Sequence, residues 1–112
     1  MPLDKTSFGS LIASARKEQK LSQKELAERI LKEDGQAITP QYLNDIEHDR
    51  RNPSSDYLVR QFAKVLKHPE LSVDVLTALA GVLTDDDRKL VQRAKPESVE
   101  KAYVAFRREL KK

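Results

Sequence analysis

Hydrophobic side chains recur at helical spacing along nearly the whole chain, and this periodicity restricts the fold more than any other feature. Phe8, Leu11, Ile12 and Ala15 stand at positions i, i+3, i+4 and i+7, which places them on one face of a helix. Similar spacing returns in later segments up to Leu110. The sequence therefore predicts an all-α protein.

Helix-start signals divide this pattern into separate helices. Ser22 is followed three residues later by Glu25, which is a capping box: each side chain accepts a hydrogen bond from the other residue's free backbone N–H. Thr39 is a good N-cap and Pro40 a good first helical residue, because an N–H at that position would have no partner. Further helix starts are expected at Thr6 or Ser7, at Ser54 or Ser55, at Ser72 and at Thr84, and a last helical stretch follows Pro96.

Length and composition exclude several classes of protein. The 112 residues suffice for one compact domain with an appendage, and the absence of cysteine excludes disulfides and thiolate metal sites. The N-terminus lacks a secretory signal and no apolar run reaches membrane-spanning length, so a cytoplasmic protein is expected. The net charge of +3, from 21 basic and 18 acidic residues, does not by itself indicate a nucleic-acid partner.

Groups that could support catalysis do not cluster in the sequence. His48 and His68 are the only histidines, and they are far apart with no cysteine nearby. No Ser/His/Asp arrangement, glycine-rich phosphate loop or apolar carboxylate pair is evident. An enzyme is therefore disfavoured, and neither a metal ion nor a cofactor is expected.

The helices expected to start at Ser22 and Thr39 have the layout of a helix-turn-helix. In this motif one short helix crosses the DNA backbone, and the next presents its N-terminal turn to base edges in the major groove. The polar residues on that turn are Gln41, Asn44 and Asp45. Glutamine and asparagine can both make paired hydrogen bonds to adenine, so this turn is suited to reading double-stranded DNA.

The segments LSQKELAERI and ITPQYLNDIEHDRRNPS resemble the DNA-binding domain that lambdoid phage repressors share with the xenobiotic-response-element family of bacterial regulators. The similarity extends from about residue 8 to residue 76 and is carried by residues 21–23, 25–27, 39–43, 46–47 and 51–54. It implies a five-helix lambda-repressor-like DNA-binding domain over residues 1–80. Residues 81–112 would form a short C-terminal helical extension.

The same resemblance implies particular DNA contacts. Bases would face Pro40, Gln41, Asn44 and Asp45, with only an apolar contact available to the proline, for example with a thymine methyl group. The DNA backbone would meet Arg16, Gln23, Thr39, Tyr42, Arg50, Arg51 and Asn52.

Alternatives stay open at several of these positions. Asp45 could hold Arg50 instead of reading a base, and Tyr42 could pack against the following loop. Glu47 is expected to be structural, because a carboxylate near phosphates needs a partner, and Arg51 is the candidate partner.

A polar insert separates the two helices of the motif. Seven residues, 31–37, lie between Ile30 and Ile38, where family members usually have far fewer. These residues either prolong the preceding helix by a turn or bulge as a loop. Loop closure costs only ~0.6 kcal/mol per doubling of length, so the insert is compatible with the fold.

The last helical stretch carries an apolar stripe of Val99, Tyr103, Phe106 and Leu110 at near-heptad spacing. This stripe either joins two chains in a homodimer or folds back on its own domain. The leading hypothesis is a sequence-specific regulator, most simply a repressor on a two-fold operator. The alternative is an antitoxin-like or immunity-regulator protein whose C-terminal segment binds a toxin or protease, with DNA binding used for autoregulation.

Overall fold

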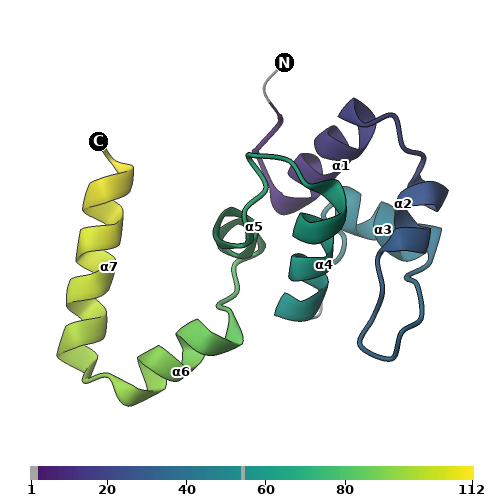
Figure 1. The fold of residues 1–112 in the computed structure, drawn as a ribbon. Coiled ribbons are helices and arrows are strands. Elements are labelled where there is room, and N and C mark those ends of the chain that lie inside the picture. The colour runs from purple at the N-terminus through teal and green to yellow at the C-terminus, as the bar shows by residue number, and fades with distance from the viewer. Residues whose placement is uncertain (1–2, 54) are drawn as a thin grey trace. The chain divides into compact units, whose positions relative to one another are not determined.

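The computed structural model describes residues 3–53 and 55–112, and within them the chain is all-α, as the sequence predicts. The helices, in chain order, are α1 (Phe8–Glu18), α2 (Gln23–Arg29), α3 (Pro40–Glu47), α4 (Asp56–Leu66), α5 (Val73–Ala80), α6 (Asp85–Arg93) and α7 (Pro96–Leu110) (Figure 1). None of these helices is long and apolar enough to cross a membrane.

The chain divides into two compact units. Residues 1–82 contain α1 to α5 and will be called the first unit, and residues 83–112 contain α6 and α7 and will be called the second unit. The first unit holds the helices of the expected DNA-binding domain. The second unit corresponds to the expected extension.

Side-chain caps fix most of the helix starts where the sequence predicts them. The side chains of Ser7, Ser22, Thr39, Ser55, Ser72 and Thr84 each accept a hydrogen bond from the backbone N–H three residues later. The capping box of Ser22 and Glu25 is formed in both directions, and hydrogen bonds from Ser22 hold the pKa of the Glu25 carboxyl below its usual value. Gly81 ends α5 with a φ of 75°, a left-handed conformation that favours glycine. Ser54, the other candidate cap of α4, lies outside the described residues.

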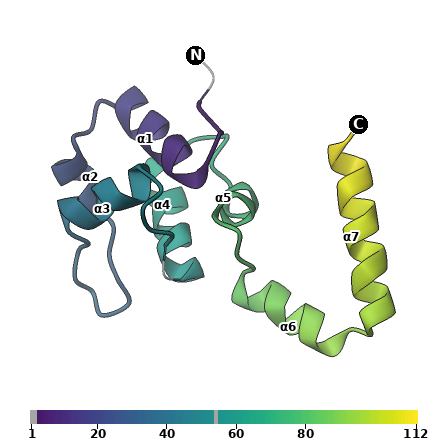
Figure 2. The same ribbon diagram turned by 180° about the vertical axis from the view of Figure 1, so that it is seen from behind.

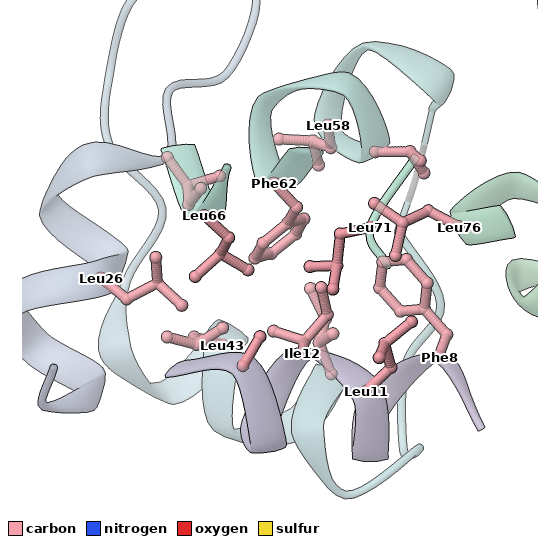
Figure 3. Packing of buried hydrophobic residues seen from close by; sticks show 14 of the residues in the cluster. Phe8, Leu11, Ile12, Leu26, Leu43, Leu58, Phe62, Leu66, Leu71 and Leu76 are labelled. Carbon is pink, nitrogen blue, oxygen red and sulfur yellow. The ribbon is translucent and has the colours of Figure 1, made fainter. Parts of the chain in front are cut away.

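The core of the first unit draws side chains from all five of its helices (Figure 3). Phe8 of α1 meets Phe62 of α4 edge-to-face, with ring centroids 5.9 Å apart. Leu26 of α2 and both Leu43 and Ile46 of α3 are fully buried. Because one face of α2 and one face of α3 are held in this core, their opposite faces are left at the surface.

The insert between α2 and α3 is a short hairpin, which settles the alternative between a longer helix and a loop. Leu31 and Ala37 form an antiparallel bridge, and the N–H of Lys32 donates to the carbonyl of Gln36 at 2.8 Å. Gly35 turns the tip with a φ of 86°. All residues from 31 to 37 are exposed, so the insert adds nothing to the core.

Replacing residues 32–36 with a two-residue turn that contains glycine is expected to leave the helix content unchanged. The buried residues that flank the hairpin, Ile30 and Ile38, stay joined by their own backbone hydrogen bond of 3.0 Å. Far-ultraviolet circular dichroism and the thermal midpoint test this. Ile38→Ala is the control and should destabilise by about 2–5 kcal/mol, because it empties part of the core. Loss of cooperative unfolding in the shortened variant would show that the insert is required for folding.

Candidate nucleic-acid interface

Helix α3 is positioned by its buried side and by its N-cap. Leu43 and Ile46 anchor it, while Thr39 accepts from the N–H of Tyr42 at 3.0 Å and Pro40 occupies the first helical position. Figure 2 shows α3 beside α2, as Figure 1 does from the other side. The first turn of α3 is thereby exposed, with the side chain of Gln41 at the surface.

A cluster of four polar side chains, which we call the Glu47 cluster, ties α1, α2 and α3 together. Arg16 donates from Nε to Oε2 of Glu47 at 2.7 Å and from Nη2 to Oε1 at 2.9 Å, which is a bidentate ion pair. Gln23 donates to Oε1 of Glu47 and to Oδ1 of Asn44, both at 3.0 Å. The side chains of Arg16 and Glu47 are only 11% and 3% exposed, so this pair is largely withdrawn from water.

The partner of Glu47 differs from the one expected. Arg51 was the candidate, but the structure pairs Glu47 with Arg16. Arg16 also donates from Nη1 to the carbonyl of Leu21 at 2.9 Å. The guanidinium of Arg51 instead lies over the ring of Tyr42, 5.7 Å from its centroid. Glu47 is structural, as expected, and the identity of its partner was predicted wrongly because α1 lies far away in the sequence.

Asp45 organises the loop that follows α3. Its Oδ1 accepts from Nε2 of Gln41 and from Nε of Arg50, each at 3.1 Å. Its backbone carbonyl accepts from the N–H groups of Arg50 and Arg51. The alternative in which Asp45 holds Arg50 is therefore present in the structure. The Asp45 carboxylate also holds Gln41 on the exposed face of α3.

The C-terminal end of α3 is fastened to the first turn of α1. Asp49 accepts from the hydroxyl of Ser7 at 2.6 Å and from the N–H of Gly9 at 3.1 Å. A carboxylate is favourable there, because the first N–H groups of a helix lack partners and carry partial positive charge. Sequence reasoning missed Asp49, since its partners are some 40 residues earlier and no local motif marks it.

Gly9 permits this close approach of α1 and α3. A Cβ atom at this position would lie 2.3 Å from the carbonyl oxygen of Ile46 and 2.8 Å from that of Glu47. Both obstacles are backbone atoms of α3, which cannot rotate away. Only glycine allows α1 to sit this close to α3.

The structure thus places the candidate DNA-contacting residues in two settings. Thr39, Pro40, Gln41, Arg50, Arg51 and Asn52 are exposed on α3 and the loop after it, whereas Arg16, Gln23, Tyr42, Asn44 and Asp45 are half-buried. In the second group, Arg16, Gln23 and Asn44 all belong to the Glu47 cluster. Apart from Arg16, which is on α1, both groups lie on α2, on α3 with its N-cap, or in the following loop, and their DNA contacts stay predictions.

The comparison with known proteins finds a match that covers α2 and α3. Residues 12–66 match the family model described as Helix-turn-helix, which represents Cro- and C1-type bacterial DNA-binding regulators. The matched residues include all of α2 and α3, and they end with the last residue of α4. No curated protein and no solved structure gives a significant match.

Proposed function

Because residues 12–66 match the helix-turn-helix family model, we propose that this chain is a transcriptional repressor that binds a two-fold operator as a homodimer. Helix α3 enters the major groove, and its first two turns read bases through Pro40, Gln41, Asn44 and Asp45. The resemblance to the xenobiotic-response-element regulators supports this assignment.

The observation that carries the proposal is the contrast between the two sides of α3. Its inner side is locked by Leu43, Ile46 and the Glu47 cluster, so the helix is held at a defined position. Its outer side presents Gln41, which is bound to Asp45 and can exchange that hydrogen bond for one to a base. A rigid support beneath exposed donors and acceptors is what base reading requires.

Backbone contacts come from the rim of the same surface. Arg50 and Arg51 are exposed in the loop after α3, where phosphates would attract their charge. Gln23 lines a groove together with Lys17, His48 and the Arg16–Glu47 pair. In the proposed complex Arg16 acts chiefly by fixing Glu47, which in turn accepts from Gln23, and a phosphate in this groove would be met by Gln23.

Gln41→Ala is expected to weaken operator binding while leaving binding to scrambled DNA almost unchanged. A side chain with a paired donor and acceptor discriminates between bases by ~1–3 kcal/mol per good contact. Arg51→Ala should weaken binding to both DNAs in similar proportion and lower the slope of log affinity against log salt by about one. The measurement is a salt titration of each variant on an operator obtained by selection from random DNA.

Two matched variants control these changes. Gln36→Ala removes the same side chain from the exposed insert, and Arg60→Ala removes the same charge from α4. Neither should alter the ratio of operator to scrambled affinity. Equal loss on both DNAs for Gln41→Ala would show that α3 is not the reading helix. A chain with no preferred site at all would refute the proposed function.

A further inference from the structure

Helix α7 carries an apolar surface that nothing in its own unit covers. Tyr103, Phe106 and Leu110 are 41%, 51% and 69% exposed, and Val99, one turn before Tyr103, is half-buried. The rings of Tyr103 and Phe106 meet at an angle of 67° with centroids 6.2 Å apart, so they form one continuous ridge. An amphipathic helix with such a ridge gains stability when another apolar surface covers it.

The spacing of this ridge is that of a coiled-coil seam. Val99, Tyr103, Phe106 and Leu110 are separated by steps of four, three and four, which assigns them to heptad positions d, a, d and a. The e positions beside the seam are then occupied by Glu100 and Arg107, and the g positions by Ala102 and Glu109. These assignments specify which side chains of α7 would face a partner helix and which would flank the seam.

Charge is unevenly distributed along α7. The first half of α7 holds Glu97, Glu100 and Lys101, whereas at the C-terminal end Arg107, Arg108, Lys111 and Lys112 outnumber a single carboxylate, Glu109, which pairs with Lys112. Two copies packed in parallel would bring these cationic ends together, which is unfavourable. Two antiparallel copies would separate the cationic ends and place each of them beside the half of the other helix that holds Glu97 and Glu100.

We propose that α7 pairs with α7 of a second copy of this chain as an antiparallel two-helix coiled coil. In an antiparallel pair, a positions pack against d positions, and e positions lie opposite e positions. The register that packs Tyr103 against Phe106 of the second copy also packs Val99 against its Leu110. The same register sets Glu100 opposite Arg107 of the second copy, and the two-fold axis forms that ion pair twice.

A parallel pair would leave Arg107 without an acidic partner. There e positions face g positions, so Arg107 would lie opposite Ala102 of the second copy and have no acidic partner. Antiparallel pairing also sets the dipoles of the two helices in opposite directions, which is the more favourable arrangement. The pattern of charge therefore favours the antiparallel orientation, with which the apolar seam is compatible.

This pairing deepens the proposed function, because it supplies the two-fold axis that the proposed operator requires, and it rests on that function for its biological purpose. It is measured on the full chain without DNA, by analytical ultracentrifugation at low salt. Glu100→Arg and Arg107→Glu are each expected to raise the dissociation constant of the dimer about tenfold, because each change turns both ion pairs into repulsions. Combining the two changes should restore the dissociation constant to within about twofold.

A matched control separates pairing from net charge. Arg108→Glu makes the same change of charge as Arg107→Glu on the outer face of α7, and it should leave the dissociation constant within about twofold of the original. A combined variant that stays as weak as the single ones would overturn the antiparallel register. A chain that is monomeric at every concentration, with its ridge covered by its own first unit or by a different protein, would overturn the pairing.

Cysteine crosslinking tests the orientation directly, because the chain has no cysteine of its own. The Val99→Cys and Leu110→Cys variants are oxidised separately and as a mixture. Antiparallel pairing predicts a crosslinked dimer in the mixture and almost none from either variant alone, whereas crosslinking of each variant with itself would show parallel pairing. An operator-binding dimer whose dissociation constant is unchanged by Glu100→Arg and by Arg107→Glu would refute this inference alone, and a dimer paired through α7 without operator preference would refute the proposed function alone.

Discussion

Glu47→Ala is expected to lower the free energy of unfolding of the first unit by about 3–5 kcal/mol, because it leaves the charge of Arg16 largely buried without a partner. The Arg16 side chain is only 11% exposed, and two of its nitrogens donate to this one carboxylate. Gln23 loses an acceptor in the same variant. Urea denaturation at neutral pH, followed by circular dichroism, measures the change.

Two further variants separate a loss of charge from a loss of packing. Glu28→Ala removes an exposed carboxylate from α2 and should change stability by less than about 0.5 kcal/mol. Replacing both partners, with Arg16→Met and Glu47→Leu together, should be far less harmful than removing Glu47 alone, since no unpaired charge remains. Near-normal stability of Glu47→Ala would contradict the structural importance of the Glu47 cluster.

The second large effect is expected from Gly9→Ala, which should destabilise the protein although the same change inside a helix usually stabilises. Alanine in place of glycine inside a helix ordinarily stabilises by about 0.5–1 kcal/mol. At Gly9 the added methyl group would lie 2.3 Å from the carbonyl of Ile46, so α1 and α3 must separate. We expect a destabilisation of about 1–3 kcal/mol in thermal or urea unfolding, together with weaker operator binding because α3 shifts.

A double variant shows which contact is responsible. The new methyl group would also lie 2.6 Å from Oδ1 of Asp49, and Asp49→Ala removes that obstacle. Combining the two changes should not restore stability, because the two backbone carbonyls remain in place. Lys17→Ala, on the exposed side of α1, should be close to neutral. A stabilised Gly9→Ala variant would contradict the close packing of α1 on α3.

Local signals made most of the fold predictable from the sequence. A capping side chain and the N–H that it satisfies are three residues apart. Short motifs in the sequence therefore mark the starts of α2 at Ser22 and of α3 at Thr39. The apolar spacing of α1 identified its buried face in the same way. These features depend on neighbours along one helix, which sequence periodicity records.

The candidate site was predictable by residue type but not by partner. The exposed position of Gln41 follows from the buried positions of Leu43 and Ile46 on the same helix. The pairing of Glu47 with Arg16 spans 31 residues and depends on how α1 packs against α3, so Arg51 was the nearer but wrong choice. Long-range contacts of this kind have no periodic signature.

The conformation of the insert, residues 31–37, was only partly predictable from the sequence. Its polar composition and the Asp34-Gly35 pair indicated a turn, yet one more turn of α2 was equally compatible with the sequence. The decision comes from the bridge between Leu31 and Ala37 and from the N–H of Leu31, which donates to Oε1 of Gln61 at 3.3 Å. Gln61 lies outside the insert, and no motif within the seven residues marks the bridge.

The closed stem of this hairpin has a practical consequence. Because Leu31 and Ala37 are joined across the stem, the ends of α2 and α3 keep their separation whatever number of residues forms the tip. Related chains could therefore gain or lose tip residues during evolution without a change in the orientation of α3. For the same reason the tip is a suitable place for a fluorescent reporter. In a chain without cysteine, Glu33→Cys creates a single attachment point from which the approach of DNA can be followed.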